Sequence, residues 1–168
     1  GEVARLANLV WESSLPAYEH PYTDKKGLKP TGARLGNFPF YKTPELGQPI
    51  EPFKHEHALL VPILNAKGKI VSLQAYFNGP ISLGGDNTTD RAYMKGGQKQ
   101  GCYSLIGTPK STIAIVEGYA TGLTVHLATG WAVMVAFDAG NMSAIAKLAR
   151  EHFPTTEIII AGDNDPDN

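Results

Sequence analysis

The chain has 168 residues, of which 42% are hydrophobic and 18% charged, and its formal net charge at pH 7 is −1. This length fits one domain of ordinary size, or one domain with a smaller lobe, and is sufficient to bury a core. No apolar run approaches the length needed to span a bilayer, and the single Cys102 excludes an intramolecular disulfide. We therefore expect a globular protein of the cytoplasm, without membrane contact.

The charges are unevenly divided along the chain. Residues 1–110 contain 13 Lys and Arg against 9 Asp and Glu, whereas residues 111–168 contain 2 against 7. We therefore expect a basic lobe over residues 1–110 and an acidic domain over residues 111–168. An ordinary solvated surface can produce the same division, so charge alone does not establish a phosphate-binding surface.

The basic lobe begins with a predicted helix and a predicted connector. Residues 2–13 place Leu6, Leu9 and Val10 on one face, which is the pattern of an amphipathic helix that docks on the lobe. Residues 30–52 contain several Pro and Gly and are typical of a loop.

Two predicted strands and a basic, glycine-rich segment follow. Residues 59–64 and 70–77 have strand character and are joined by a hairpin-type turn. The next segment combines glycines with cations and aromatic residues: Arg91, Tyr93, Lys95, Lys99 and Tyr103. Cations neutralise phosphate and aromatic faces stack on bases, so the segment is a candidate template or nucleotide contact. A solvated loop with buried tyrosines has the same composition, and this alternative stays open.

The acidic domain repeats a strand and a helix. Apolar or β-branched runs alternate with helix-length segments in the order 112–116, 119–130, 131–137, 142–153 and 157–162. Strands that read as continuous apolar runs are typical of parallel sheets, whose two faces are both covered by helices. The sequence therefore predicts an α/β fold with the order βαβαβ.

Each predicted strand of this domain is followed by a carboxylate. Glu117 follows the first strand, Asp138 the second, and Asp163 and Asp165 the third. The carboxyl ends of parallel strands meet at one edge, so these groups should converge there, and mutually repelling carboxylates require a cation. Oxygen ligands without His or Cys suit Mg²⁺ or Mn²⁺. Asp138 equally suits a helix cap or turn, so it and the nearby Asn141 are only accessory candidates.

These motifs resemble the Toprim domain of bacterial primases, type IA and II topoisomerases and some nucleases. The primases of plasmids and phages are most similar in three segments: "IVEGYATGLTVHLATG", "VAFDAGN" and "IIIAGDND". The resemblance extends upstream through "HPYTDKKGLKP", "LLVPILNAKGKIVSLQAYF" and "RAYMKGGQKQGCYSLIG". The resemblance implies a primase that synthesises RNA primers on a single-stranded DNA template from ribonucleoside triphosphates, with a replicative helicase domain or protein as a further candidate partner.

The resemblance also implies roles for individual residues. Glu117 would be the general base, and Asp163 and Asp165 would bind the divalent ions; Glu117 as an indirect metal ligand is an alternative that the sequence does not exclude. The likeness to the basic region of primases favours nucleic-acid or nucleotide contacts for the cations and Tyr93 of the glycine-rich segment. In nucleotidyl transfer a few carboxylates, the ions and positioning groups are sufficient.

Two features depart from the resemblance. A Toprim domain normally continues with another helix and strand after its Asp-x-Asp, and zinc-ribbon Cys/His clusters are absent from this sequence. We therefore expect a C-terminally incomplete Toprim sheet in a piece of a longer protein. Two alternatives remain: a Toprim nuclease, in which water replaces the attacking hydroxyl, and a non-catalytic nucleic-acid-binding or assembly module.

Overall fold

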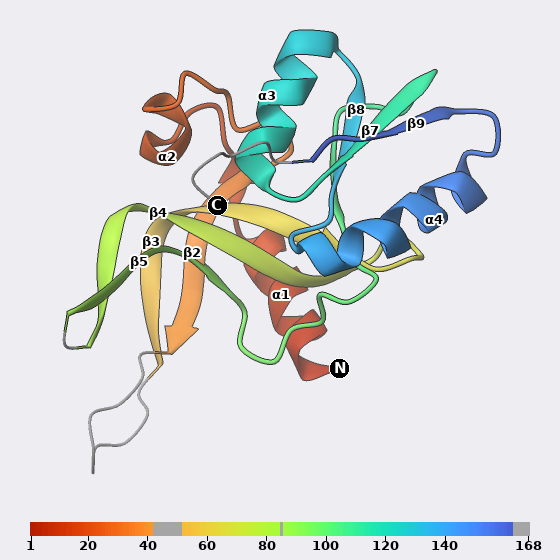
Figure 1. The fold of residues 1–168 in the computed structure, drawn as a ribbon. Helices are drawn as coiled ribbons and strands as arrows, with labels where there is room; N and C mark the ends of the chain where they lie inside the picture. Colours follow the sequence, from red (N-terminus) through yellow and green to blue (C-terminus); the bar gives the residue numbers. More distant parts are fainter. Residues whose placement is uncertain (42–51, 85, 163–168) are drawn as a thin grey trace. The chain divides into compact units, whose positions relative to one another are not determined.

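The chain folds into two compact units (Figure 1). The structure is a computed structural model and describes residues 1–41, 52–84 and 86–162. The first unit comprises residues 1–63 and 70–98, and the second comprises residues 64–69 together with the chain from Lys99 onward.

The first unit is built on a five-stranded sheet with the strand order β1-β2-β3-β4-β5. Its elements are α1 (Glu2–Glu12), β1 (Leu15–Pro16), α2 (Pro21–Asp24), β2 (Arg34–Tyr41), β3 (Pro52–Leu64), β4 (Ile70–Gly84) and β5 (Asn87–Tyr93). The pairs β1–β2, β2–β3 and β4–β5 are antiparallel. The two predicted strands are thus confirmed as parts of β3 and β4, which extend further than the sequence indicated.

An asparagine shapes the turn between β3 and β4. The side-chain oxygen Oδ1 of Asn65 accepts hydrogen bonds from the backbone N–H groups of Lys67 and Lys69, each at 3.0 Å. Gly68 takes a left-handed φ of 76°, which a glycine adopts without steric cost. This turn belongs to the second unit, although the strands that it joins lie mainly in the first.

Helix α1 covers one face of the first sheet. The buried residues between them are Ala7, Phe38, Ala58, Leu60, Leu73, Ala75, Phe77 and Met94. From the helix, Val3, Leu6, Val10 and Trp11 pack against this core. The amphipathic helix is confirmed, but the inclusion of Leu9 in its buried face was wrong, because Leu9 is 50% exposed.

The prediction of a loop over residues 30–52 was wrong for residues 34–41, which form β2. Proline disfavours an interior strand because it lacks an N–H donor. At Pro39 this lack is tolerated, because β1 pairs with β2 at Arg34 and Leu35. Further along β2, no strand of the described residues pairs with the side away from β3. Residues 42–51 lie outside the described residues.

The second unit confirms the predicted βαβαβ order. Its elements are β6 (Ser104–Ile106), β7 (Thr112–Val116), α3 (Tyr119–Thr129), β8 (Ala132–Val135), a 3-10 turn (Ala139–Asn141), α4 (Met142–His152) and β9 (Glu157–Ile160). The sheet order is β6-β8-β7-β9; β7 is parallel to β8 and β9, whereas β6 is antiparallel to β8. Because β6 joins this sheet, the unit begins earlier in the sequence than the expected boundary after residue 110.

The helices of the second unit cover opposite faces of its sheet (Figure 1). Successive strand residues alternate between the faces. Towards α4 point Ile113, Ile115, Ala132 and Met134, which pack with Ile145 and Ala149. On the other face Gly122 brings α3 close to the sheet, since a Cβ there would lie 2.9 Å from Ile106, 3.1 Å from Val135 and 3.3 Å from Val116.

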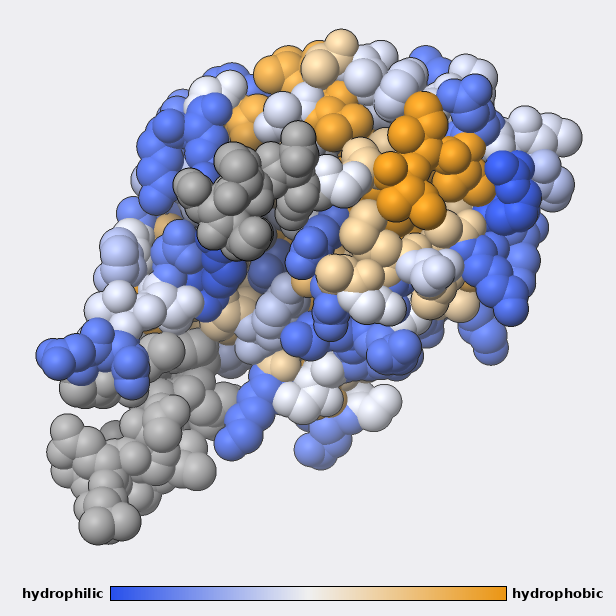
Figure 2. Space-filling model, viewed as in Figure 1, coloured by the Kyte–Doolittle hydropathy of each residue, from blue (hydrophilic) through white to orange (hydrophobic). Residues whose placement is uncertain are grey.

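Strand β9 is an edge of this sheet and is less buried than β7. Ile160 is 58% exposed, and Figure 2 shows hydrophobic residues at the surface in the region where β9 lies in Figure 1. No described helix is long and apolar enough to cross a membrane.

The difference in burial between β7 and β9 gives a prediction about stability. Ile115→Ala should lower the free energy of unfolding by about 2–5 kcal/mol, because it removes buried methyl groups and leaves a cavity. Ile160→Ala, the matched control on the exposed strand, should lower it by about 1 kcal/mol or less. Urea denaturation of both variants measures the difference. Equal losses would contradict the central position of β7.

Candidate metal and nucleic-acid sites

Glu117 lies directly after β7, at the carboxyl edge of the parallel strands. Its backbone carbonyl accepts a 2.7 Å hydrogen bond from the N–H of Phe137, which follows β8. Phe137 has a φ of 68°, which is rare for a bulky side chain. The turn after β8 is thereby tied to the end of β7, next to the candidate catalytic carboxylate.

The strand order places a topological switch point at this edge. The connection after β7 leads to α3 on one face of the sheet, and the connection after β8 leads to α4 on the other. Neighbouring strands whose connections leave towards opposite faces define the position at which open α/β sheets bind ligands. Glu117 and Asp138 follow these two strands, so the edge carries both residues.

Asp138 acts as a cap in this structure. Its Oδ1 accepts a 3.0 Å hydrogen bond from the N–H of Gly140 and so caps the 3-10 turn. This is the local role that the sequence left open as an alternative to metal binding. Asn141 is 4% exposed, and its side chain forms hydrogen bonds with the backbone of Gly101, Lys99, Cys102 and Ala136, so it stabilises the local fold.

The expected metal ligands Asp163 and Asp165 lie outside the described residues. Among the residues that the structure describes, no group of three or more His, Cys, Asp or Glu side chains lies close enough to hold a metal ion. The end of β9 nevertheless runs beside β7, because the N–H of Ala161 donates to the carbonyl of Ile115 at 2.9 Å. An edge with Glu117 and carboxylates that follow β9 in the sequence fits a hard cation such as Mg²⁺ or Mn²⁺.

In the first unit, Arg91 lies over two stacked tyrosines. The ring centroids of Tyr22 and Tyr76 are 3.9 Å apart with an interplanar angle of 13°. The Cζ atom of Arg91 is 5.7 Å from the centroid of Tyr22 and 5.1 Å from that of Tyr76, within the range of cation–π attraction. Arg91 Nε also donates to Asp90 at 2.9 Å, and the Arg91 side chain is still 48% exposed.

Two lysines that the sequence analysis did not select lie near the same ring. The Nζ atoms of Lys25 and Lys26 are 5.8 and 5.3 Å from the Tyr22 centroid. We name these two lysines, Arg91 and the two tyrosines the cation–tyrosine cluster. The feature of the sequence that could have identified them is the adjacent Lys pair in "HPYTDKKG".

A buried histidine holds α2 in place. His20 Nδ1 accepts a 3.0 Å hydrogen bond from the N–H of Tyr22, and its Nε2 lies 3.1 Å from the carbonyl oxygen of His57. One ring nitrogen therefore caps α2 and the other contacts β3. His57 has a left-handed φ of 56° at this point of β3. The contact fixes the segment that carries the cluster's lysines.

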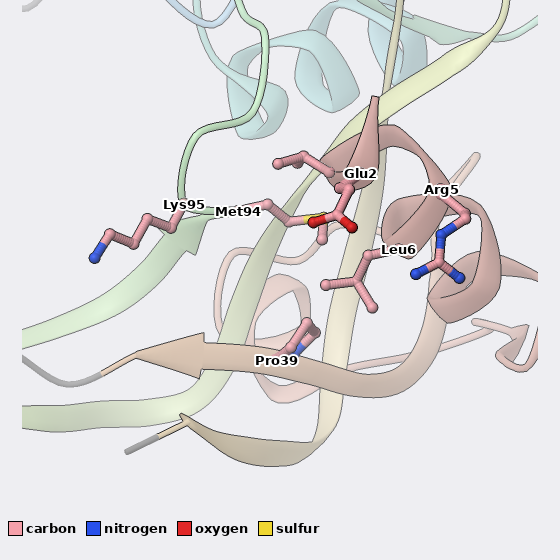
Figure 3. Close-up of a pocket in the computed structure, with 7 residues that line it drawn as sticks. Glu2, Arg5, Leu6, Pro39, Met94 and Lys95 are labelled. Carbon is pink, nitrogen blue, oxygen red and sulfur yellow. The ribbon is translucent and has the colours of Figure 1, made fainter. Parts of the chain in front are cut away.

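The other sequence candidates have different surroundings. Tyr93 lies opposite Gln74 in the β4–β5 ladder, two residues from Arg91 and therefore on the same sheet face. Lys95 lines a pocket of about 220 Å³ with Arg5, Glu2, Val3, Leu6, Pro39 and Met94. In Figure 3 its ammonium group extends outward, away from Leu6 and Arg5. Lys99 belongs to the second unit.

Backbone geometry explains three glycines of the basic segment. Gly96 and Gly101 have φ values of 75° and 72°, which favour glycine. A Cβ at Gly97 would lie 2.9 Å from the Cβ of Ser72, so only glycine lets the chain pass this closely over β4. Close approach to β4 therefore explains Gly97 without a bound phosphate.

Residues 111–167 match the family described as Toprim domain. This part of the chain is a Toprim domain. The structure adds β6, from residues that precede the match, to the same sheet. Glu117 thus follows the first strand of the Toprim domain.

Relatives extend the similarity beyond the Toprim domain. A protein named DNA primase TraC from Escherichia coli is 38% identical over 80 residues, 45% of this chain and 8% of that protein. Another DNA primase TraC from Escherichia coli is 34% identical over 110 residues, 62% of this chain and 7% of that protein. The chain therefore spans less than a tenth of the length of these relatives.

Two solved primase structures are also similar. The Aquifex aeolicus primase, with its zinc-binding and RNA polymerase domains, gives a TM-score of 0.47 at 15% identity over 76% of this chain and 32% of that one. The RNA polymerase domain of Mycobacterium tuberculosis primase DnaG gives 0.42 at 16% identity over 92% of this chain and 53% of that one.

The cluster predicts a pH dependence of stability in the unit that precedes the Toprim domain. Burial raises the pKa of the Tyr76 hydroxyl well above its ordinary value of 10.0, so the folded state retains this proton more tightly than the unfolded state. The resulting stabilisation is complete below about pH 10 and is lost as the pH rises towards the folded-state pKa.

Tyr76→Phe should therefore make the fall in unfolding free energy above about pH 10 shallower. Urea denaturation at several alkaline pH values measures this slope. Tyr18→Phe is the control, because Tyr18 is 79% exposed. An identical slope in wild type and Tyr76→Phe would show that Tyr76 ionises equally well in both states.

Proposed function

We propose that this chain is the core of a primase that synthesises RNA primers on single-stranded DNA by divalent-metal-dependent nucleotidyl transfer. The observation that carries the proposal is the position of Glu117 at the carboxyl edge of a Toprim sheet. Its support is the similarity to proteins named DNA primase. Such an enzyme would act in the cytoplasm, with ribonucleoside triphosphates as substrates and a replicative helicase as a candidate partner.

The carboxylates would provide the catalytic site. Asp163 and Asp165, with Glu117, would hold Mg²⁺ or Mn²⁺, which neutralises the triphosphate charge when bound. Glu117 would accept the proton of the attacking 3′-hydroxyl as a general base; indirect metal binding is its alternative role. The backbone bond from Phe137 to Glu117 fixes the start of this loop, which supports either role.

The cation–tyrosine cluster would bind the backbone of the single strand. Lys25 and Lys26 are exposed, and Arg91 is 48% exposed, so their cationic groups can reach phosphate. The rings of Tyr22 and Tyr76 are only 2% exposed, which leaves them no free face for a base. Their role would be to hold Arg91 by cation–π contact, whereas the half-buried Tyr93 is the better candidate for stacking on a base.

Lys95 and Lys99 complete the proposed set of nucleic-acid contacts. Both are exposed, and in the sequence they lie on either side of Gly96 and Gly97. Asp138 and Asn141 are proposed to serve the fold of the edge and not to bind metal, because their side chains bond to backbone groups.

Catalysis gives a prediction that separates the candidate functions. With a single-stranded template, ribonucleotides and Mn²⁺, the protein should incorporate nucleotides, and Glu117→Gln should reduce the rate at least about 100-fold, as expected for loss of a general base. Asp163→Asn with Asp165→Asn should abolish both activity and Mn²⁺ binding in a titration. The exposed Glu151→Gln on α4 is the matched control.

The other outcomes identify the alternatives. Metal-dependent cutting of DNA without incorporation would favour the Toprim nuclease. Binding without turnover, in the presence of every substrate, would favour the non-catalytic module. Mn²⁺ binding that survives the double Asp variant would place the metal elsewhere.

Nucleic-acid binding gives a separate prediction for the cluster. Replacing Lys25, Lys26 and Arg91 by Gln, one at a time, should weaken binding of an oligonucleotide regardless of its sequence. Each lost phosphate contact should flatten the slope of log affinity against log salt by roughly 0.7. Fluorescence anisotropy at several salt concentrations measures the slope, and Lys147→Gln, an exposed lysine of α4, is the control. Unchanged slopes in all three variants would leave the cluster without a nucleic-acid role.

A further inference from the structure

Asn141 joins two distant segments of the second unit through one buried side chain. Its Nδ2 lies 3.1 Å from the carbonyl oxygen of Ala136, 2.9 Å from that of Cys102 and 3.3 Å from that of Lys99. Its Oδ1 accepts a hydrogen bond from the N–H of Gly101 at 2.8 Å. The backbone from Lys99 to Cys102 is thus fastened to the end of β8.

Local structure would favour a different use of this side chain. Asn141 occupies the N-cap position of α4, where asparagine is among the preferred residues, yet it makes no side-chain cap bond there. Asp138 caps the preceding turn instead. The amide of Asn141 therefore bonds to the Lys99–Cys102 segment and does not cap α4.

The fastened segment is connected to the candidate catalytic edge. The N–H of Ala136 donates to the carbonyl of Val116 at 2.8 Å, and the N–H of Phe137 donates to the carbonyl of Glu117 at 2.7 Å. The backbone of Lys99 is therefore joined by hydrogen bonds, through Asn141 and the end of β8, to the strand end that bears Glu117.

We infer that Asn141 is a positioning residue for nucleic-acid binding: it holds the Lys99–Cys102 backbone at the carboxyl edge so that the exposed Lys99 meets the single strand. Asn141 itself touches no substrate in this assignment. The inference rests on the proposed function, because it gives the contact of Lys99 with nucleic acid a structural origin. It adds a role for a residue that the sequence analysis could name only as an accessory candidate.

A matched control separates positioning from general stabilisation. Asn8 in α1 also uses its Nδ2 to donate to two backbone carbonyls, those of Ala4 at 2.8 Å and Ile70 at 2.9 Å. Asn8→Ala therefore removes a comparable anchor from the first unit, without affecting the Lys99 segment. All variants are compared in the same protein, at a temperature where thermal denaturation shows each to be folded.

The first measurement needs no nucleic acid. In Asn141→Ala, trypsin should cleave after Lys99 at least several-fold faster than in wild type or Asn8→Ala, because the segment has lost its anchor. If Asn141→Ala does not fold, Asn141→Ser, which keeps a small polar side chain, is tested in the same way. An unchanged rate of cleavage after Lys99 would overturn the inference.

The second measurement concerns the single strand. Lys99→Gln should flatten the slope of log affinity for an oligonucleotide against log salt concentration by roughly 0.7. Asn141→Ala should flatten the slope in the same direction. The double variant should lose no more of the slope than Lys99→Gln alone. If Asn141→Ala keeps the wild-type slope while Lys99→Gln reduces it, this inference is overturned but the nucleic-acid role of Lys99 is supported. An unchanged slope in Lys99→Gln would overturn that role, and the inference with it.

Discussion

The second unit depends on the two parallel ladders of β7. Ile115 pairs with Met134 on one side and with Ile160 on the other, so one strand sets the register of both neighbours. Its alternate residues face α3 and α4, which leaves neither face of the strand open to water. Since all three parallel strands end at the same edge, the positions of Glu117 and Asp138 follow from this pairing and not from any direct attraction between them.

The sequence was sufficient to predict the parts of the fold that rest on local patterns. Apolar runs and helix-length segments predicted the βαβαβ order, and α3 ends at Gly130, whose φ is 74°. Strand β6 was missed because it has only three residues and its strand partner, β8, lies later in the chain. Strand β2 was missed because Gly36 and Pro39 are typical of loops. Pro39 fits this strand because β1 is short and pairs with β2 only at Arg34 and Leu35.

Only part of the candidate site was predictable from the sequence. Glu117 could be placed because a strand end needs only sequence order, and Arg91 because cations among glycines are conspicuous. Lys25 and Lys26 could not be linked to Arg91, because the link is the stacking of Tyr22 on a tyrosine of β4, which pairs residues far apart in the chain. The use of Asn141 was hidden for the same reason, since its local position favours capping.

The interleaving of the two units affects how this chain can exchange parts with its relatives. The polypeptide passes between the units three times, after residues 63, 69 and 98, so no single cut releases either unit intact. A genetic crossover at residue 111, where the Toprim family match begins, would separate β6 and the β3–β4 turn from the sheet region with which they are grouped. Productive recombination should therefore favour exchange of the whole region over shuffling of the Toprim segment alone.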